Sequence, residues 1–248
     1  MIQNIIKGIK AYLGAFQLIS KLKLWKYFTI PTIISLLTAI VVGSMAYGLS
    51  DNLGHYFANF WKWEFGKETF EIISTFLSGL LIVIVGLVLY KHIVMALSAP
   101  FMSPVSEKIE NYMVGESHLH RNTSFQEQFI RGIRINVRNF IRGMFLTIII
   151  ILFGLIPVIG IISTVLLFLV QAYYAGFGNM DYTLERHFKY KESIRFVKEN
   201  KGLAIGNGIV FMLFLLIPVV GVLLVLPLSV TAATTETIKK IQLKELPE

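Results

Sequence analysis

The sequence predicts an all-α integral membrane protein with two long transmembrane helices and two re-entrant helical hairpins. Composition gives the class, because 55% of the 248 residues are hydrophobic, 15% are charged, and the mean hydropathy is +0.67. A soluble domain carries more charge and less apolar surface. The formal net charge of +8 is concentrated between the apolar stretches, as in membrane proteins whose basic loops set their orientation. The hairpins are predicted from a Leu-Ile-Pro-Val-x-Gly motif that occurs twice, at residues 155–160 and 216–221.

The residue types present exclude several functional classes. The chain has no cysteine, and therefore neither a disulfide framework nor thiolate chemistry. It contains no glycine-rich phosphate loop, nucleophile elbow or paired catalytic carboxylates, and no basic module interleaved with aromatic residues. His118 and His120, with Glu116 nearby, are fewer ligands than a metal site needs. We therefore expect no enzymatic activity, no metal, no cofactor and no nucleic-acid partner.

The N-terminal segment, residues 1–26, is predicted to be an amphipathic helix lying on the membrane surface. Its apolar side chains recur at helical spacing, and its polar side chains fall elsewhere on the helical wheel. The apolar residues are Ile2, Ile5, Ile6, Ile9, Tyr12, Leu13 and Phe16, and the polar ones are Gln3, Lys7, Lys10 and Gln17.

Two stretches are predicted to cross the membrane, residues 27–49 and 70–101. The first has 23 residues, enough at about 1.5 Å per residue for a hydrocarbon core of roughly 30 Å. Pro31 falls in its first turns, where proline is tolerated. The connection between the stretches is nearly neutral and carries the aromatic residues typical of a membrane interface, namely Tyr56, Phe57, Phe60, Trp61 and Trp63.

A polar region at residues 103–143 is long enough for two helices, which we expect on the cytoplasmic side. It ends in four arginines that recur every three or four residues and therefore share one helix face. One interpretation is an anchor that contacts lipid phosphates, and the other is a vestibule that attracts anions. The four are Arg131, Arg134, Arg138 and Arg142.

Each copy of the repeated motif interrupts an apolar run, residues 144–176 in one case and 202–235 in the other. The halves of the first run hold 13 and 15 residues, so each is about 20 Å long as a helix and too short to span the bilayer. Proline disfavours helical geometry in the residue before it, and glycine adopts conformations that other residues avoid. The chain is predicted to turn at Pro157 and Gly160, and again at Pro218 and Gly221, 61 residues further on.

Charge distinguishes a hairpin from a kinked crossing. The link at residues 181–201 has six Lys and Arg against four acids, so it belongs on the same side as the arginines that precede the first run. A hairpin returns the chain to that side, whereas a crossing does not. The tail, residues 236–248, carries further lysines and is expected on the same side.

The hairpin tips suggest transport and assembly. Backbone that leaves the helix inside hydrocarbon must be covered by protein or face water, so we expect a homo-oligomer. The returning helices begin near mid-membrane, where their positive dipole ends favour anions, as in transporters with broken helices. Asn207 is a candidate for a polar path, with Ser163, Thr164, Gln171, Thr231 and Thr234. Helix packing explains these residues, and the glycines Gly202, Gly206 and Gly208, equally well.

Several motifs resemble the CysZ sulfate permeases and the related etoposide-induced membrane protein family. The likeness covers nearly the whole chain and is strongest from about Leu97 to Thr235. It is carried by the two Leu-Ile-Pro-Val turns and by Asp181-Tyr182, Leu184-Glu185-Arg186-His187, Pro227, Leu-Ser-Ala-Pro-Phe at residues 97–101 and Glu-Lys-Ile-Glu at residues 107–110.

The resemblance implies an oligomeric protein of the bacterial inner membrane that admits sulfate for cysteine biosynthesis. It also implies a sulfate site in a Gly-Leu-Arg-Arg stretch just before the first crossing. The corresponding residues here are Lys23, Leu24, Trp25 and Lys26, so lysines replace the glycine and one arginine. Lysine binds an anion as a point charge, without the two-pronged guanidinium of arginine. Glu185 is expected to pair with a basic neighbour and, with Arg186, to have a structural role.

Two functions follow from these observations. The first is anion uptake, with sulfate as the substrate, Lys23, Leu24 and Lys26 as the binding residues, and Arg131, Arg134 and Arg138 supplying a favourable field. The second is a scaffold or regulator that does not transport and binds anionic lipid or a partner protein through the N-terminal helix and basic loops. In both cases the protein contacts the lipid bilayer, with both termini in the cytoplasm.

Overall fold

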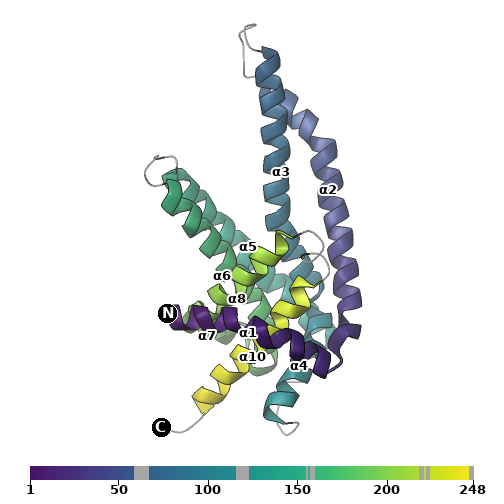
Figure 1. Ribbon diagram of the computed structural model, residues 1–248, viewed down its shortest axis with the longest axis vertical. Helices are drawn as coiled ribbons and strands as arrows, with labels where there is room; N and C mark the ends of the chain where they lie inside the picture. The colour runs from purple at the N-terminus through teal and green to yellow at the C-terminus, as the bar shows by residue number, and fades with distance from the viewer. Residues whose placement is uncertain are drawn as a thin grey trace.

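The computed structural model describes residues 1–58, 67–115, 123–154, 156, 160–217, 221 and 224–245, and every regular element within them is helical. Two long helix pairs, α2 with α3 and α5 with α6, rise from a base that holds α1, α4, α7 and α10 (Figure 1). The elements are α1 (Ile2–Lys21), the 3₁₀ helix η1 (Leu24–Phe28), α2 (Thr29–Ala58), α3 (Lys67–Leu97), α4 (Ala99–Val114), α5 (Phe125–Gly154), α6 (Gly160–His187), α7 (Tyr190–Glu199), α8 (Lys201–Leu215) and α10 (Val225–Glu245).

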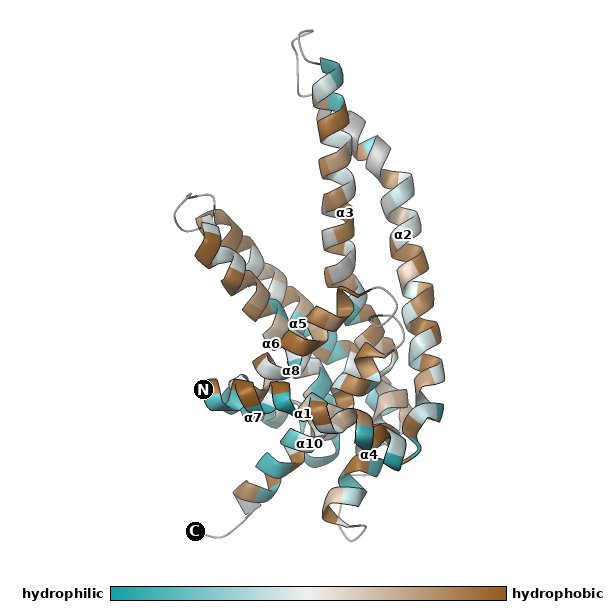
Figure 2. Cartoon of the chain, viewed as in Figure 1, coloured by the Kyte–Doolittle hydropathy of each residue, from teal (hydrophilic) through white to brown (hydrophobic). Residues whose placement is uncertain are grey.

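The chain is a multi-pass membrane protein, as the sequence predicts. Among the described residues, three segments are long and apolar enough to cross a membrane: Leu24–Leu49, Phe125–Gly154 and Gly160–His187. A fourth results if the end of α3 and α4, which meet at an angle of 68°, form one broken span. Hydrophobic residues cover α2, α3 and the outer halves of α5 and α6, whereas hydrophilic residues gather toward the base (Figure 2).

The α2 and α3 pair buries small and polar residues between its helices. A Cβ atom at Gly86 would lie 2.4 Å from Cγ1 of Val42, so the two backbones approach closely. Small and hydroxyl residues permit such contact between membrane helices, and here they are Ser35, Thr38, Ser74 and Ser78. Large apolar side chains instead point outward and are exposed, including Ile30, Ile33, Leu37 and Ile40 on α2 and Ile72, Phe76, Leu77 and Leu80 on α3. An exposed apolar surface of this extent marks a lipid-facing or docking surface.

Helices α5 and α6 form an antiparallel pair around the first repeated motif. The Gln171 amide donates to Thr147 Oγ1 at 2.9 Å, and a Cβ at Gly154 would lie 3.1 Å from that of Ser163. The chain therefore reverses where the sequence predicts, although Pro157 lies outside the described residues. Both helices extend beyond the predicted apolar halves, because each continues into the polar base without a break.

Helices α8 and α10 reverse the chain in the same way around the second motif. The Asn207 amide donates to the Ser229 carbonyl at 2.9 Å, and the amide of Gly221 donates to the carbonyl of Ile217 at 2.7 Å. Pro218 lies outside the described residues. Helix α10 runs on to Glu245, so most of the predicted tail is helical.

Helix α1 has three stripes of side chains. One is buried against α8 and α10 and holds Gly8, Tyr12, Ala15 and Ile19. The second is polar and contains Lys7 and Lys10. The third is apolar but exposed, and consists of Ile2, Ile6, Ile9, Leu13 and Phe16. At 100° per residue these stripes occupy roughly a third of the circumference each, so the predicted apolar face is divided between a buried part and an exposed part.

Glycines bring α1, α6 and α8 into backbone contact at the centre of the molecule. A Cβ at Gly176 would lie 1.8 Å from the Ala204 carbonyl oxygen, and one at Gly208 would lie 1.7 Å from that of Ala172. A Cβ at Gly206 would lie 2.1 Å from the carbonyl oxygen of Ile5. Gly206 and Gly208 therefore serve close helix packing, one of the two explanations that the sequence allows.

Candidate functional site

The residues between α1 and α2 form a tight turn that exposes two lysines. Lys23 has φ 52° and ψ 42°, and it is the single non-glycine residue with positive φ in the described part of the chain. Glycine adopts this left-handed conformation without steric cost, whereas in other residues the Cβ atom comes too close to the following carbonyl oxygen. The next residue, Leu24, is completely buried in the main hydrophobic cluster. Leu24 thus anchors the turn while Lys23 and Lys26 remain exposed.

Two more lysines meet this turn, from the end of α1 and from α4. The Nζ atoms of Lys26 and Lys108 lie 5.3 and 5.5 Å from the centre of the Tyr27 ring. Lys21 donates to the hydroxyl of Tyr112. These cation–π contacts hold ammonium groups at a partly exposed surface. We call the group of Lys21, Lys23, Lys26 and Lys108 the lysine corner.

The predicted arginine stripe on α5 is divided between two environments. Arg131 forms a two-pronged ion pair with Asp181, with nitrogen–oxygen distances of 2.9 and 3.1 Å, and also donates to Ser193 and to the Phe188 carbonyl. Arg134 is exposed and stacks on Tyr190, 4.0 Å from the ring centre. Both arginines line an open hollow of about 440 Å³ with Lys189, Glu127, Ser124, Gln126, Ile130 and Tyr190.

Arg138 and Arg142 lie outside the lining of that hollow. The guanidinium of Arg138 is 5.0 Å from the centre of the Phe177 ring, and it donates to Asn139 Oδ1 at 2.7 Å. Arg142 is exposed one turn further along α5. The hollow thus brings Arg131 and Arg134 together with a third cation, Lys189, whereas Arg138 does not line it.

Asn207 is a buried junction of four helices, α1, α6, α8 and α10. Its amide group accepts a hydrogen bond from Asn179 at 2.8 Å and donates to the Ser229 carbonyl at 2.9 Å. The Tyr12 hydroxyl lies 2.8 Å from the Asn207 carbonyl and 2.7 Å from Ser229 Oγ. A phenol has one proton, so Tyr12 donates to the carbonyl and accepts from the serine. Burial raises the pKa of Tyr12 far above its ordinary value, so the phenol stays neutral.

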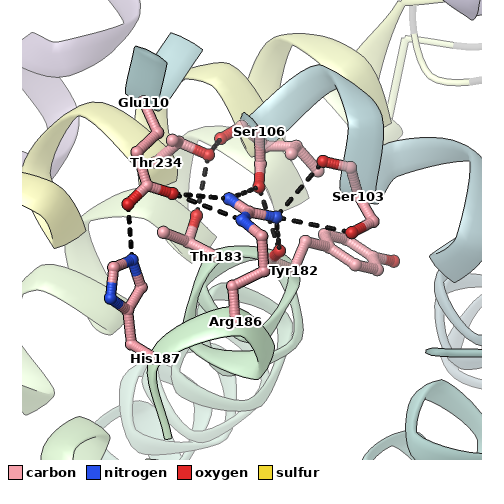
Figure 3. Close-up of polar contacts among 9 residues, drawn as sticks. Ser103, Ser106, Glu110, Tyr182, Thr183, Arg186, His187 and Thr234 are labelled. Atoms are coloured by element: carbon pink, nitrogen blue, oxygen red, sulfur yellow. Dashed lines mark hydrogen bonds and ion pairs between the residues drawn. The ribbon is translucent and has the colours of Figure 1, made fainter. Parts of the chain in front are cut away.

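A second buried network joins α4 to α6 (Figure 3). The Arg186 guanidinium lies 2.9 Å from Glu110 Oε2, and His187 contacts the other carboxylate oxygen. Arg186 also donates to Ser106 Oγ at 2.6 Å, to the Tyr182 carbonyl at 2.9 Å and to the Ser103 carbonyl at 3.3 Å. The sequence analysis named Glu110 only within the Glu-Lys-Ile-Glu motif at residues 107–110, and this partnership was missed.

The expected pairing of Glu185 with a basic neighbour is not seen among the described residues. Its Oε1 atom has no hydrogen-bond partner and the carboxylate forms no ion pair within the described residues. The neighbouring basic residues are instead paired with Asp181 and Glu110. Helical geometry explains this, because the side chains of adjacent residues such as Glu185 and Arg186 point in directions about 100° apart.

The fold and the lysine corner describe a helical multi-pass membrane protein with a cationic turn just before its first span. A protein-family model described as Sulfate transporter CysZ/Etoposide-induced protein 2.4 matches residues 11–226. The chain therefore belongs to this family, which confirms the resemblance drawn from its motifs. A search of curated proteins finds no match.

Proposed function

We propose that this protein mediates the uptake of inorganic anions across the bacterial inner membrane, with sulfate for cysteine biosynthesis as the substrate. The family supports a sulfate-transporter-like activity. The observation that carries the proposal is the lysine corner, where a left-handed turn and a buried Leu24 hold Lys23 and Lys26 in an exposed position. The corner lies at the start of the Leu24–Leu49 span, where an anion meets the membrane.

In this proposal Lys23 and Lys26 capture the anion and Leu24 fixes the turn between them. Lys21 and Lys108 add positive charge at the same corner. Arg131, Arg134 and Arg138 supply a longer-range field that raises the local anion concentration. Arg134 contributes most, because it is exposed, whereas Arg131 is neutralised by Asp181. Asn207 holds α6, α8 and α10 together beside the route.

The two chain reversals are proposed to be re-entrant hairpins that begin and end in the cytoplasm. Beyond the exposed Arg142, the apolar end of α5 runs from Gly143 to Gly154, roughly 18 Å of helix and shorter than the hydrocarbon core. The exposed stripe of α1 lies against the membrane interface and leaves Lys7 and Lys10 in water. A second copy of the chain covers the apolar tips, so the active form is a homo-oligomer.

The depth of the first tip is testable because the chain has no cysteine of its own. We expect a cysteine in place of Ile161, an exposed residue just after Gly160, to resist an impermeant thiol reagent added from outside. A cysteine in place of Tyr56, near the end of α2, should react readily. Equal labelling rates at the two positions would show that the tip emerges from the membrane.

Sulfate uptake into liposomes tests the function. We expect vesicles with the purified protein to take up radiolabelled sulfate faster than empty vesicles, and the double variant Lys23→Gly/Lys26→Ala to lose most of that uptake. Lys23→Gly also removes the steric strain of the left-handed turn, which stabilises the folded state by about 1 kcal/mol. The greater flexibility of glycine in the unfolded chain offsets part of this gain. The melting temperature should therefore not fall, which attributes lost uptake to charge rather than to misfolding.

The matched control removes two lysines elsewhere on the same segment. Lys7→Ala/Lys10→Ala changes exposed residues of α1 and should leave uptake unchanged. If the Lys23 and Lys26 variant transports normally, the lysine corner is not the binding site.

A scaffold that does not transport is the second candidate, favoured by the exposed apolar stripe of α1, which suits binding to a membrane surface. The same experiment distinguishes the two functions. Folded protein that moves sulfate no faster than empty vesicles contradicts the transport proposal and supports the scaffold.

A further inference from the structure

Lys91 is a fully buried lysine where α3, α5 and α6 meet. Its exposed fraction is 0%, and it is one of the largest side chains that the fold encloses completely. The ammonium donates to the side-chain oxygen of Gln171 and lies 3.3 Å from the Gln171 carbonyl. The amide of Gln171 in turn donates to Thr147 Oγ1 on α5 at 2.9 Å.

The packing of α3 against α2 places Lys91 level with the middle of the Leu24–Leu49 span. Gly86 packs against Val42 in the antiparallel α2 and α3 pair. Lys91, five residues beyond Gly86, is therefore level with Leu37, five residues before Val42. Leu37 is ten residues into the crossing that starts at Tyr27, or about 15 Å along the helix, which is near the middle of a core of roughly 30 Å.

Only neutral groups accept hydrogen bonds from this ammonium within the described residues. No ion pair found among the described residues includes Lys91. The adjacent residue, His92, is buried edge-on against Phe140, and its Nδ1 atom has no partner among the described groups. A cation in hydrocarbon without a counter-charge is costly, and ionisable residues at this depth usually serve function.

We propose that Lys91 is an intramembrane ligand for a divalent oxyanion in transit, an inference that rests on the proposed function. The anion takes the place of Gln171 Oε1 as acceptor of the ammonium. The Gln171 amide and the Thr147 hydroxyl are then adjacent donors for further oxygens. A single lysine binds as a point charge, which holds the anion less tightly than a two-pronged arginine and lets it leave again.

Sequence analysis did not single out Lys91, which lies inside the second predicted crossing, residues 70–101. A lone lysine in a crossing ordinarily extends its ammonium toward the headgroup region. The packing of α5 and α6 against α3 encloses the side chain instead.

The test compares sulfate uptake by vesicles that carry wild-type protein, Lys91→Met, Lys91→Arg or Lys198→Met. Lys198→Met is the matched control, since it removes an exposed lysine from α7. We expect Lys91→Met to lower the maximal rate by about tenfold or more, as for the loss of a charge-assisted contact. Lys91→Arg should retain part of the rate, and Lys198→Met all of it. Neutral replacements of buried charges are commonly tolerated by the fold.

Each other result overturns the inference in a recognisable way. If the wild-type protein moves no sulfate, both the proposed function and this inference are wrong. If Lys91→Met takes up sulfate as fast as the wild type, the proposed function is unaffected and Lys91 is not a ligand of the anion. If Lys91→Met and Lys91→Gln both fail to purify as folded protein while Lys91→Arg folds, the ammonium has a structural role and the inference is wrong.

Discussion

Replacing Gly208 by alanine is expected to destabilise the protein by about 2–3 kcal/mol, although it adds a single methyl group. The new Cβ would lie 1.7 Å from the carbonyl oxygen of Ala172, which belongs to the backbone of α6. A backbone atom cannot rotate away as a side chain can, so α6 and α8 must separate. Their separation also breaks the reciprocal contact of Gly176 with Ala204.

The matched control is alanine at Gly14. Gly14 lies on α1 with no atom within 4 Å of an added Cβ, and alanine gains about 1 kcal/mol over glycine inside a helix. The melting temperatures of the purified proteins should therefore move in opposite directions, down for Gly208→Ala and level or up for Gly14→Ala. If both variants melt alike, the α6 and α8 crossing is looser than its backbone geometry requires.

Hydropathy and charge predict the architecture of this chain well. The apolar stretches, the two chain reversals and the membrane class all follow from the composition of contiguous segments, which sequence displays directly. The helix ends at the base were placed less well, because α5 and α6 pass from apolar to polar surface without a helix-breaking residue. A change of environment along a helix leaves the backbone hydrogen bonds unchanged, so hydropathy marks the membrane boundary rather than the end of the helix.

The candidate site was only partly predictable, since its partners come from distant segments. The left-handed turn at Lys23 was not predicted, although the glycine that the family stretch has at this position is the residue that adopts such a turn most readily. The ion pair of Arg131 with Asp181 and the enclosure of Lys91 depend on how α3, α5 and α6 pack. Sequence spacing relates residues within one helix, whereas these contacts join residues 50 and 80 positions apart.

The buried pair of Arg186 and Glu110 gives the other large expected effect. Glu110→Gln should destabilise the protein by about 3–5 kcal/mol, because it leaves a guanidinium with a side-chain exposure of 4% among neutral oxygens. The replacement keeps the shape of the side chain but turns one of its two acceptor oxygens into an amide donor, so the loss combines the missing charge with one lost acceptor for Arg186 or His187. Arg186→Met should cost less, since His187 still contacts the Glu110 carboxylate.

A double variant and an exposed pair make this expectation specific. Glu110→Gln/Arg186→Met removes both charges and should recover much of the stability that Glu110→Gln loses, because a buried pair replaced as a whole is often close to neutral. Glu199→Gln removes the acid of an exposed pair with Arg195 on α7, worth only about 0.5 kcal/mol. Thermal unfolding of the purified proteins gives the comparison. A double variant no more stable than Glu110→Gln would show that the cost comes from the hydrogen-bonded network around Ser103 and Ser106, and not from an uncompensated charge.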